Sequence, residues 1–326
     1  MNAEDVYAGD DAYQAEMFAQ LRAAGVTVMR QNFRWEYTVP SRGVYAWAQL
    51  DRFVLAAARQ RMKVLALVYG EPAWATSRPP GQEDANCTFP PADNADYGEF
   101  ARQIVLRYGR GGAFWNAYPD LAAFAITDYE LWNEPTLPRF WGCTPDAAAY
   151  VAMARAASQA IRAVDPQATI ISAGTPDETA RIRAYFKAAM RAGARSVFTA
   201  LGVHSYGVRV QTVVNDLQSA RTVIDAAGLK HWPIHLTEWG WATAGPASVH
   251  TVSEPAQARA VGSTIRLLWS QRHRLKLRTA IHYEWSDLPP PPGHHEFWGL
   301  NTGLLREDLT AKPALASFSA AANGLR

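Results

Sequence analysis

Strand-like and helix-like segments alternate along almost the whole chain, and this alternation limits the possible folds more than any other feature of the sequence. Short apolar or β-branched runs are separated by longer stretches in which apolar residues recur every three or four positions. A chain that alternates in this way builds βαβ units around a parallel sheet. The strand-like runs are Val26–Phe33, Val64–Tyr69, Phe124–Leu131, Thr169–Ala173, Ala200–Val203, Ile234–Thr237 and Leu277–Tyr283.

The amphipathic stretches between these runs are expected to be helices that cover the sheet. A length of 326 residues, of which 48% are hydrophobic, suits a single (β/α)8 TIM barrel domain over residues 1–326. A helical pattern at 11–24 precedes the first clear strand, and only Met1–Asp10 is left for an earlier one. We therefore expect the first strand to be truncated, irregular or absent. The other helical stretches are Leu50–Arg61, Tyr97–Tyr108, Ala147–Val164, Thr179–Arg191 and Pro255–Ser270.

The charge pattern and the apolar runs exclude two classes of partner. The net charge is +2 and its cations are scattered, so nucleic acid is not an expected partner. No apolar run approaches the roughly 20 residues of a membrane span. Met1–Asp10 has neither a basic start nor an apolar stretch like that of a signal peptide. We expect a secreted or extracellular location over a cytoplasmic one, with any export signal outside the given chain.

Two carboxylates arrive at the ends of strand-like runs. The run Phe124–Leu131 leads into Trp-Asn-Glu-Pro, which ends with Glu134 and Pro135, and the run that starts at Ile234 leads into Glu238. The carboxyl ends of barrel strands carry the active site. Counted with the weak first strand, these are the fourth and seventh strands, whose ends are expected to face each other. Two facing carboxylates can cleave a glycosidic bond.

These residues resemble glycoside hydrolase clan A, and within it most closely family 39 and its relatives, with family 5 next. The resemblance rests on Trp132-Asn-Glu-Pro135, on Thr237-Glu-Trp-Gly240, on Arg30 and Trp35, and on Trp285 after the last strand. It extends over roughly Asp11 to Ser317. The pair Asn-Glu followed by a late Glu, in barrel order, is a specific signal, whereas either part alone is weak.

The resemblance implies a retaining glycoside hydrolase that acts on an oligosaccharide or polysaccharide. It makes Glu134 the acid/base and Glu238 the nucleophile, and it requires no metal or organic cofactor. Asn133 is then expected to hold the sugar 2-hydroxyl, Arg30 to steady the nucleophile, and Trp285 to form the floor of the sugar site. The full set of expected substrate-binding residues is Arg30, Trp35, Trp74, Asn133, His204, Tyr206 and Trp285.

Simpler interpretations exist for each of these residues. A carboxylate at a strand end can pair with a surface cation, Arg30 can form an ion pair, His204 can be a core histidine, and Trp74 can pack within a loop. The alternative function is a non-catalytic carbohydrate-binding barrel, which would keep aromatic residues but not both glutamates. Retention of Glu134 and Glu238 favours the enzyme, because a carboxylic acid beside a carboxylate resists ionisation and can donate a proton.

The two cysteines, Cys87 and Cys143, lack the spacing of metal ligands. They fall in loops after neighbouring strands, so a disulfide that braces the sugar groove is one prediction. Two free thiols, as suits an intracellular enzyme, are the other. The adjacent His294 and His295 in a Pro-rich loop are expected to contact solvent or substrate rather than a metal. Loop shape, which the sequence pattern does not predict, sets the sugar, the linkage and endo or exo action.

Overall fold

The computed structural model of the chain describes residues 1–83, 85–176, 179–290 and 296–325, and for residues 179–182 the backbone alone. The chain forms two compact units. Unit 1 consists of Met1–Arg30, Arg59–Met62 and Val203–Arg326, and unit 2 consists of Gln31–Ala58 and Lys63–Gly202. His294 and His295, which are expected to contact solvent or substrate rather than a metal, lie outside the described residues.

Unit 2 is built on a four-stranded sheet in the order β1-β2-β3-β4. The β2–β3 and β3–β4 pairs are parallel and in register, with Tyr129 of β3 beside Ala66 of β2 and Ile170 of β4. The strands are β1 (Val28–Arg34, which starts in unit 1), β2 (Lys63–Tyr69), β3 (Asp128–Leu131) and β4 (Thr169–Ser172). The α-helices are α3 (Trp35–Thr38), α4 (Ala48–Arg59), α5 (Asn94–Tyr108), α6 (Ala147–Val164) and α7 (Thr179–Arg191).

Side-chain caps and close packing explain where the helices of unit 2 begin and how they meet. The carboxylate of Asp93 accepts a hydrogen bond from the first turn of α5, and Asp146 does the same for α6, which satisfies backbone donors that a helix leaves free. The two helices pack against each other at Gly98. A Cβ atom at Gly98 would lie 3.2 Å from the backbone of Ala156, so glycine allows this close approach.

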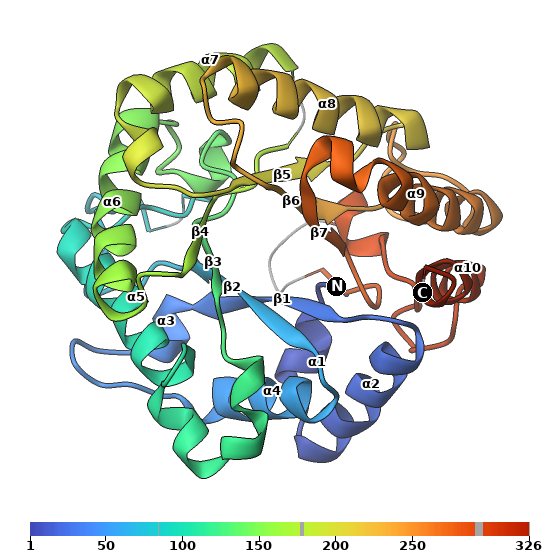
Figure 1. Cartoon of the computed structure of the whole chain (residues 1–326), viewed down its shortest axis with the longest axis horizontal. Helices are drawn as coiled ribbons and strands as arrows, with labels where there is room; N and C mark the ends of the chain where they lie inside the picture. Colours follow the sequence, from blue (N-terminus) through green and yellow to red (C-terminus); the bar gives the residue numbers. More distant parts are fainter. Residues whose placement is uncertain (84, 177–178, 291–295, 326) are drawn as a thin grey trace. The chain divides into compact units, whose positions relative to one another are not determined.

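Unit 1 contains a three-stranded sheet in the order β5-β6-β7. The central strand β6 is buried along its whole length, as expected for a parallel strand that is covered on both faces. The strands are β5 (Leu201–Ser205), β6 (Ile234–Trp239) and β7 (Leu277–His282). The helices are α1 (Glu4–Ala8), α2 (Asp11–Ala23), α8 (Val210–Ala226), α9 (Glu254–Leu275) and α10 (Pro313–Asn323), and α10 packs beside α9 (Figure 1).

The start of the chain forms the expected abbreviated strand. The Met1 amino group donates a hydrogen bond to the Val28 carbonyl, and the Arg30 N–H donates to the Met1 carbonyl. On its other side, the Asn2 N–H donates to the His282 carbonyl at the end of β7. Two residues therefore bond to β1 and to β7, and α1 begins two positions later. No regular strand occurs within residues 1–10, which confirms the prediction.

The other predicted elements are confirmed with shifted ends. All seven strand-like runs contain a strand, and the five listed helical stretches each contain a helix. Helix α9 ends at Leu275, five residues beyond the predicted Ser270. Strand β3 begins at Asp128 rather than at Phe124, because residues Pro119–Phe124 form a 3-10 helix with a proline at its start. Among the described residues, no helix is long and apolar enough to cross a membrane.

A disulfide joins Cys87 and Cys143 within unit 2, with 5.4 Å between the two Cα atoms. Two backbone hydrogen bonds, from Thr88 N–H to the Arg139 carbonyl and from Gly142 N–H to the Thr88 carbonyl, hold the same pair of loops together. The structure thus confirms the disulfide rather than two free thiols.

Candidate active site

Strand β6 delivers Glu238 at its carboxyl end. The five residues before and after it in the strand are buried, and Glu238 keeps 8% of its surface exposed. The pairing of β6 with β7 shifts register between Leu236 and Trp239, the stretch that contains Glu238. Glu238 is thus a nearly enclosed carboxylate at an irregular part of the strand.

Three polar side chains of unit 1 contact this carboxylate. Arg30 of β1 donates a hydrogen bond of 2.8 Å to Oε1 of Glu238. The Tyr206 hydroxyl, which follows β5, donates one of 2.6 Å to Oε2. Nδ1 of His204 in β5 lies 3.4 Å from the same Oε2 atom. Both carboxylate oxygens therefore have a donor or a potential cation beside them.

These contacts keep Glu238 ionised. Burial is the largest influence and by itself raises the pKa of Glu238, because it penalises the charged form. The electrostatic interactions with His204 and with the Arg30 guanidinium, together with the hydrogen bonds from Tyr206 and Arg30, outweigh burial and lower the pKa of Glu238 below its ordinary value. Glu238 is thus a desolvated carboxylate that remains charged near neutral pH, as a nucleophile requires.

A set of half-buried rings lies next to Tyr206. The ring centre of Tyr283 is 6.3 Å from that of Tyr206, and the two rings meet edge to face. Trp298 lies 4.9 Å from Tyr206 on another side, and His250 packs on Trp298 at 4.6 Å. Tyr283, Trp298 and His250 all keep part of their surface exposed. They offer the kind of flat, partly apolar surface on which sugar rings pack.

The sequence interpretation did not name these three residues among the site. The sequence does contain a signal for Tyr283, because this residue directly follows β7, and residues at the carboxyl ends of barrel strands form the active site. Trp285, which was named instead, is fully buried, and its backbone bonds to Asn2, Leu304 and Leu305. Trp285 is therefore part of the core of unit 1, and Tyr283 is the half-buried ring at this strand end.

In unit 2, the chain turns sharply after β3 to present Glu134. Trp132 and Glu134 have φ angles of +75° and +43°, a left-handed region that residues other than glycine adopt rarely. The Glu134 N–H donates to the Gly174 carbonyl, and the Gly174 N–H donates to the buried carboxylate of Glu130. Gly174 therefore bonds both to Glu134 in the turn and to Glu130 in β3. Such conformations cost roughly 1–3 kcal/mol each and concentrate at functional sites.

The loop after Glu134 is anchored to the same turn. The Trp132 indole donates a hydrogen bond of 2.7 Å to the Phe140 carbonyl, and its ring meets Trp141 edge to face. Glu134 itself is 8% exposed, and its neighbour Asn133 is half-buried. Strand β3 thus ends in an ordered turn that leaves Asn133 and Glu134 with restricted access to solvent.

Of the two tryptophans expected at the site in unit 2, one is accessible. Trp35 is 1% exposed and stacks on Phe100 with ring centres 5.5 Å apart. Trp74 meets Trp35 edge to face, donates a hydrogen bond to the Val39 carbonyl, and remains half-buried. Trp35 therefore supports Trp74 from behind, and only Trp74 presents ring surface outward.

The sequence model of the cellulase family (glycosyl hydrolase family 5) matches residues 2–269 of the chain. No curated protein matches the chain. The matched model belongs to the clan that the sequence resembles, and to the family placed second there. The family match covers most of the chain and indicates common descent. Similar solved structures indicate the fold.

Three solved structures illustrate the fold of the chain. A family 39 glycoside hydrolase from Bacteroides cellulosilyticus has a TM-score of 0.64 and 18% identity, over 94% of this chain and 60% of that one. A monomeric β-xylosidase from Caulobacter crescentus has a TM-score of 0.72 and 18% identity, over 98% and 66%. A family 5 mannosidase from Rhizomucor miehei has a TM-score of 0.62 and 12% identity, over 98% and 89%.

These likenesses confirm the fold class predicted from the sequence, an α/β fold with parallel strands that matches TIM-barrel enzymes. At identities below one fifth, they concern the fold and not the substrate. The chain spans 60% and 66% of the length of the first two of these structures.

Proposed function

Because the chain belongs to the cellulase family, glycosyl hydrolase family 5, we propose that it hydrolyses O-glycosidic bonds of an oligosaccharide or polysaccharide with retention of configuration. The observation that carries the proposal is the surroundings of Glu238, a buried carboxylate that Arg30 and Tyr206 hold in its charged form. Such a group is suited to attack an electrophilic carbon, because it is ionised, fixed in orientation and partly desolvated.

In the first step, a carboxylate oxygen of Glu238 attacks the anomeric carbon while the bond from that carbon to the leaving oxygen breaks. Glu134 donates its proton to the departing oxygen, so that the aglycone leaves as an alcohol. In the second step, Glu134 takes a proton from water, the water oxygen attacks the anomeric carbon, and the ester bond to Glu238 breaks. Two inversions give net retention.

This mechanism requires the two carboxyl groups to lie about 5 Å apart. That separation remains a prediction, and a crystal structure of a trapped glycosyl-enzyme would test it. A separation of roughly 6.5–9.5 Å, which leaves room for a water molecule, would instead point to an inverting enzyme.

We assign sugar contacts to the expected residues that keep exposed surface, namely Asn133, Trp74 and Tyr206, and we add Tyr283. Asn133 has donors and an acceptor for the sugar 2-hydroxyl. Tyr283 replaces Trp285 as the ring at the end of the last strand. Arg30 and His204 are buried against Glu238 and are assigned to the carboxylate rather than to the sugar.

The disulfide supports a location outside the reducing cytosol. Disulfides persist in secreted and extracellular proteins and are rare where glutathione keeps thiols reduced. The Cys87–Cys143 bond joins two loops that are also held by backbone hydrogen bonds. We therefore propose that the protein works in an oxidising environment.

The proposal is tested by following hydrolysis with NMR on aryl β-xylosides and β-mannosides, chosen because similar structures are a β-xylosidase and a mannosidase, and on intact β-linked polysaccharides. We expect the first product to keep the anomeric configuration of the substrate, and Glu238→Gln to abolish the reaction. An inverted first product would contradict retention. Tight carbohydrate binding without hydrolysis of any substrate would instead support the non-catalytic binding barrel.

A further inference from the structure

The carboxyl group of Glu284 is buried in unit 1, and neither step of the proposed mechanism uses it. The residue is 0% exposed and lies between the half-buried Tyr283 and the fully buried Trp285. Both of its carboxyl oxygens are buried, and neither has a hydrogen-bond partner in the described part of the chain. An ionised carboxylate in such surroundings loses its hydration without compensation, which costs far more than the burial of a neutral acid.

The strongest electrostatic influences on Glu284 are negative charges. They come from the first turn of α1, from β6 and from the loop after β7: Glu4, Asp5, Glu238 and Asp287. Burial is the largest influence, and together with these carboxylates it raises the pKa of Glu284 well above its ordinary value. The group therefore keeps its proton at pH values at which an exposed glutamate is ionised.

The cations of this region bond to other carboxylates. Nζ of Lys312 donates a hydrogen bond of 2.7 Å to Asp287, and Arg30 donates one of 2.8 Å to Glu238. Neither cation donates a hydrogen bond to Glu284. These pairs partly neutralise two of the four neighbouring acids but give the buried carboxyl group no partner of its own. A charge on Glu284 would have to be satisfied by water or by a rearrangement.

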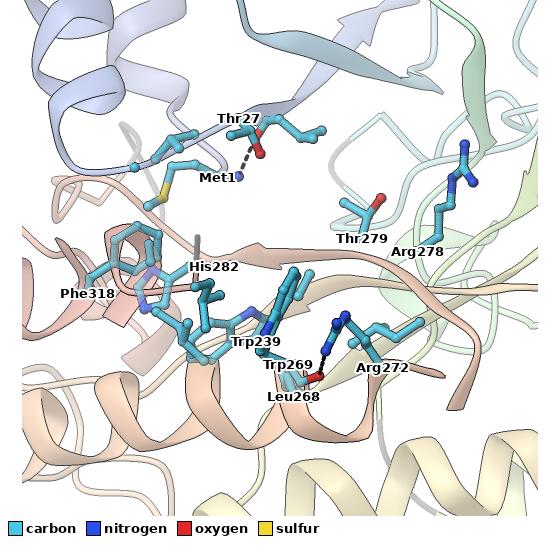
Figure 2. A pocket seen from close by; sticks show the side chains of 18 residues that line it. Met1, Thr27, Trp239, Leu268, Trp269, Arg272, Arg278, Thr279, His282 and Phe318 are labelled. Carbon is cyan, nitrogen blue, oxygen red and sulfur yellow. Dashed lines mark hydrogen bonds between the residues drawn. The ribbon is translucent and has the colours of Figure 1, made fainter. Parts of the chain in front are cut away.

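The imidazole of His282, at the end of β7, is uncharged as well. It packs against Trp239 and Phe318 (Figure 2), with ring centres 4.9 Å and 6.0 Å away. Burial is the main reason why the pKa of His282 is lowered to about 3, so the ring carries no positive charge near neutral pH. Its Nδ1 atom lies 3.2 Å from the Glu284 carbonyl, and neither ring nitrogen bonds to the Glu284 carboxyl group.

The backbone on both sides of this acid joins three parts of unit 1. The Tyr283 N–H donates a hydrogen bond to the Trp239 carbonyl at the end of β6, and the Trp285 N–H donates to the Asn2 carbonyl before α1. The Leu304 N–H donates to the Trp285 carbonyl from the loop that precedes α10. A charge on the buried acid would therefore act where these three parts meet.

We propose that Glu284 is a pH-sensitive switch of unit 1: as a neutral acid it keeps the segment after β7 closed, and its ionisation opens that segment together with α1. Ionisation places a charge in a closed site, so the segment must move to admit water. Because Tyr283 belongs to this segment, the ring beside Tyr206 moves with it. The switch does not require catalysis and is independent of the proposed function.

Higher pH should favour the open state, because the closed state binds the proton of Glu284 more tightly. In the open state Glu284 has an ordinary pKa of about 4.3. The closed state is therefore fully stable below that pH. Above it, the equilibrium between closed and open states shifts by up to about tenfold for each pH unit, until the raised pKa of Glu284 in the closed state is reached.

The test compares the pH dependence of Tm in the full chain and in Glu284→Gln, which keeps the shape of the side chain but cannot ionise. Between about pH 5 and pH 7, Tm of the unsubstituted protein should fall by about 3–5 °C more than that of Glu284→Gln. Glu284→Asp is the matched control, because it leaves a small cavity and lowers Tm at every pH but retains a buried carboxyl group. The steeper fall should remain in this control. Equal slopes for the unsubstituted protein and Glu284→Gln would overturn the proposal.

Hydrogen exchange of the unsubstituted protein locates the opening and needs no variant to fold. After correction for intrinsic exchange rates, the amides of Tyr283, Trp285 and Leu304 should lose protection by roughly tenfold per pH unit above about pH 5. The amides of Trp132 and Thr169, which bond to carbonyls within unit 2, should lose much less. Constant protection at the three amides of unit 1 would contradict the switch, and so would an equal loss in both units, since that is a general loss of stability.

Discussion

Glu238, near the end of β6, and Glu134, in the turn after β3, have different printed contacts in their two units. Glu238 is fixed through its side chain, since Arg30 and Tyr206 donate to its two oxygens and His204 lies beside one of them. Glu134 lies in a turn with two left-handed residues, and its N–H donates a hydrogen bond to the Gly174 carbonyl. Side-chain partners set the charge of a carboxylate, whereas the backbone turn sets its direction.

This difference agrees with the roles proposed for the two residues. A nucleophile must stay ionised throughout, so its environment should lower its pKa, and that of Glu238 is lowered. An acid/base must change its protonation state twice in each cycle. The comparison therefore predicts that the two sites respond differently to substitution.

The largest effect is expected at Glu238. Glu238→Ala removes the attacking oxygen, so activated aryl glycosides and unactivated glycosides should both lose roughly 10⁴-fold or more in kcat. Any rescue by azide should give an inverted product, because azide then attacks the substrate directly. Initial rates and NMR of the azide adduct measure both outcomes, and undiminished kcat in this variant would sink the proposed mechanism.

Glu134→Ala should slow substrates with poor leaving groups much more than substrates with good ones. Without the proton donor, substrates with poor leaving groups should slow by roughly 10²–10⁴-fold, whereas an activated aryl glycoside can still form the glycosyl-enzyme. That intermediate should accumulate, and azide should release it with net retention. Single-turnover kinetics with both substrates provide the measurement. A retained azide product from Glu238→Ala and an inverted one from Glu134→Ala would mean that the two roles are exchanged.

The next prediction concerns the disulfide and the loop that supports the turn at Glu134. The disulfide closes a loop with a sequence separation of 56 residues and ties down the loop whose Phe140 carbonyl accepts from the Trp132 indole, two residues before Glu134. The double variant Cys87→Ala, Cys143→Ala should lower the free energy of unfolding by about 2–4 kcal/mol. Urea unfolding measures this change.

Reduction provides the matched control for the disulfide prediction. Dithiothreitol should destabilise the unsubstituted protein by a similar amount and leave the double variant unchanged. If the double variant were as stable as the unsubstituted protein, the brace would be unimportant, and the Glu134 turn would depend on its own hydrogen bonds alone.

The smallest expected effect concerns the hydrogen bond from Tyr206 to Glu238. Tyr206→Phe removes the 2.6 Å hydrogen bond to Glu238, so the pKa of Glu238 should rise toward its ordinary value. Activity requires the ionised form and falls as pH falls through this pKa. The acidic limb of kcat/KM should therefore move to higher pH, by roughly one unit.

Tyr283→Phe is the matched control for that pH shift, because its ring lies beside Tyr206 and the substitution leaves the Tyr206 hydroxyl in place. It can change kcat/KM through the sugar contact, but the pH of the acidic limb should stay where it is. A limb that does not move in Tyr206→Phe would show that this hydroxyl does not control the charge of Glu238.

The expectations that came from strand ends and those that came from ring types had different outcomes. The positions of Glu134 and Glu238 followed from the alternation of elements: Glu238 is the second-last residue of β6, and Glu134 lies in the turn three residues after β3. Arg30 and Tyr206 were named through the family resemblance, and the structure places both on Glu238. Trp35 and Trp285 were named in the same way but are buried. The sequence around a strand end does not indicate whether a tryptophan ring there packs into the core or faces the solvent.

The sequence by itself determined the order of strands and helices, the short start of the chain, and which carboxylates end strands. These properties depend on neighbours within a few positions, because hydrophobic period and chain breakers act locally. The tertiary structure alone decided that Cys87 pairs with Cys143, that Trp285 is fully buried while Tyr283 is half-buried, and that Asn2 bonds to the end of β7. Each of these depends on residues far apart in the chain, whose packing no local pattern records.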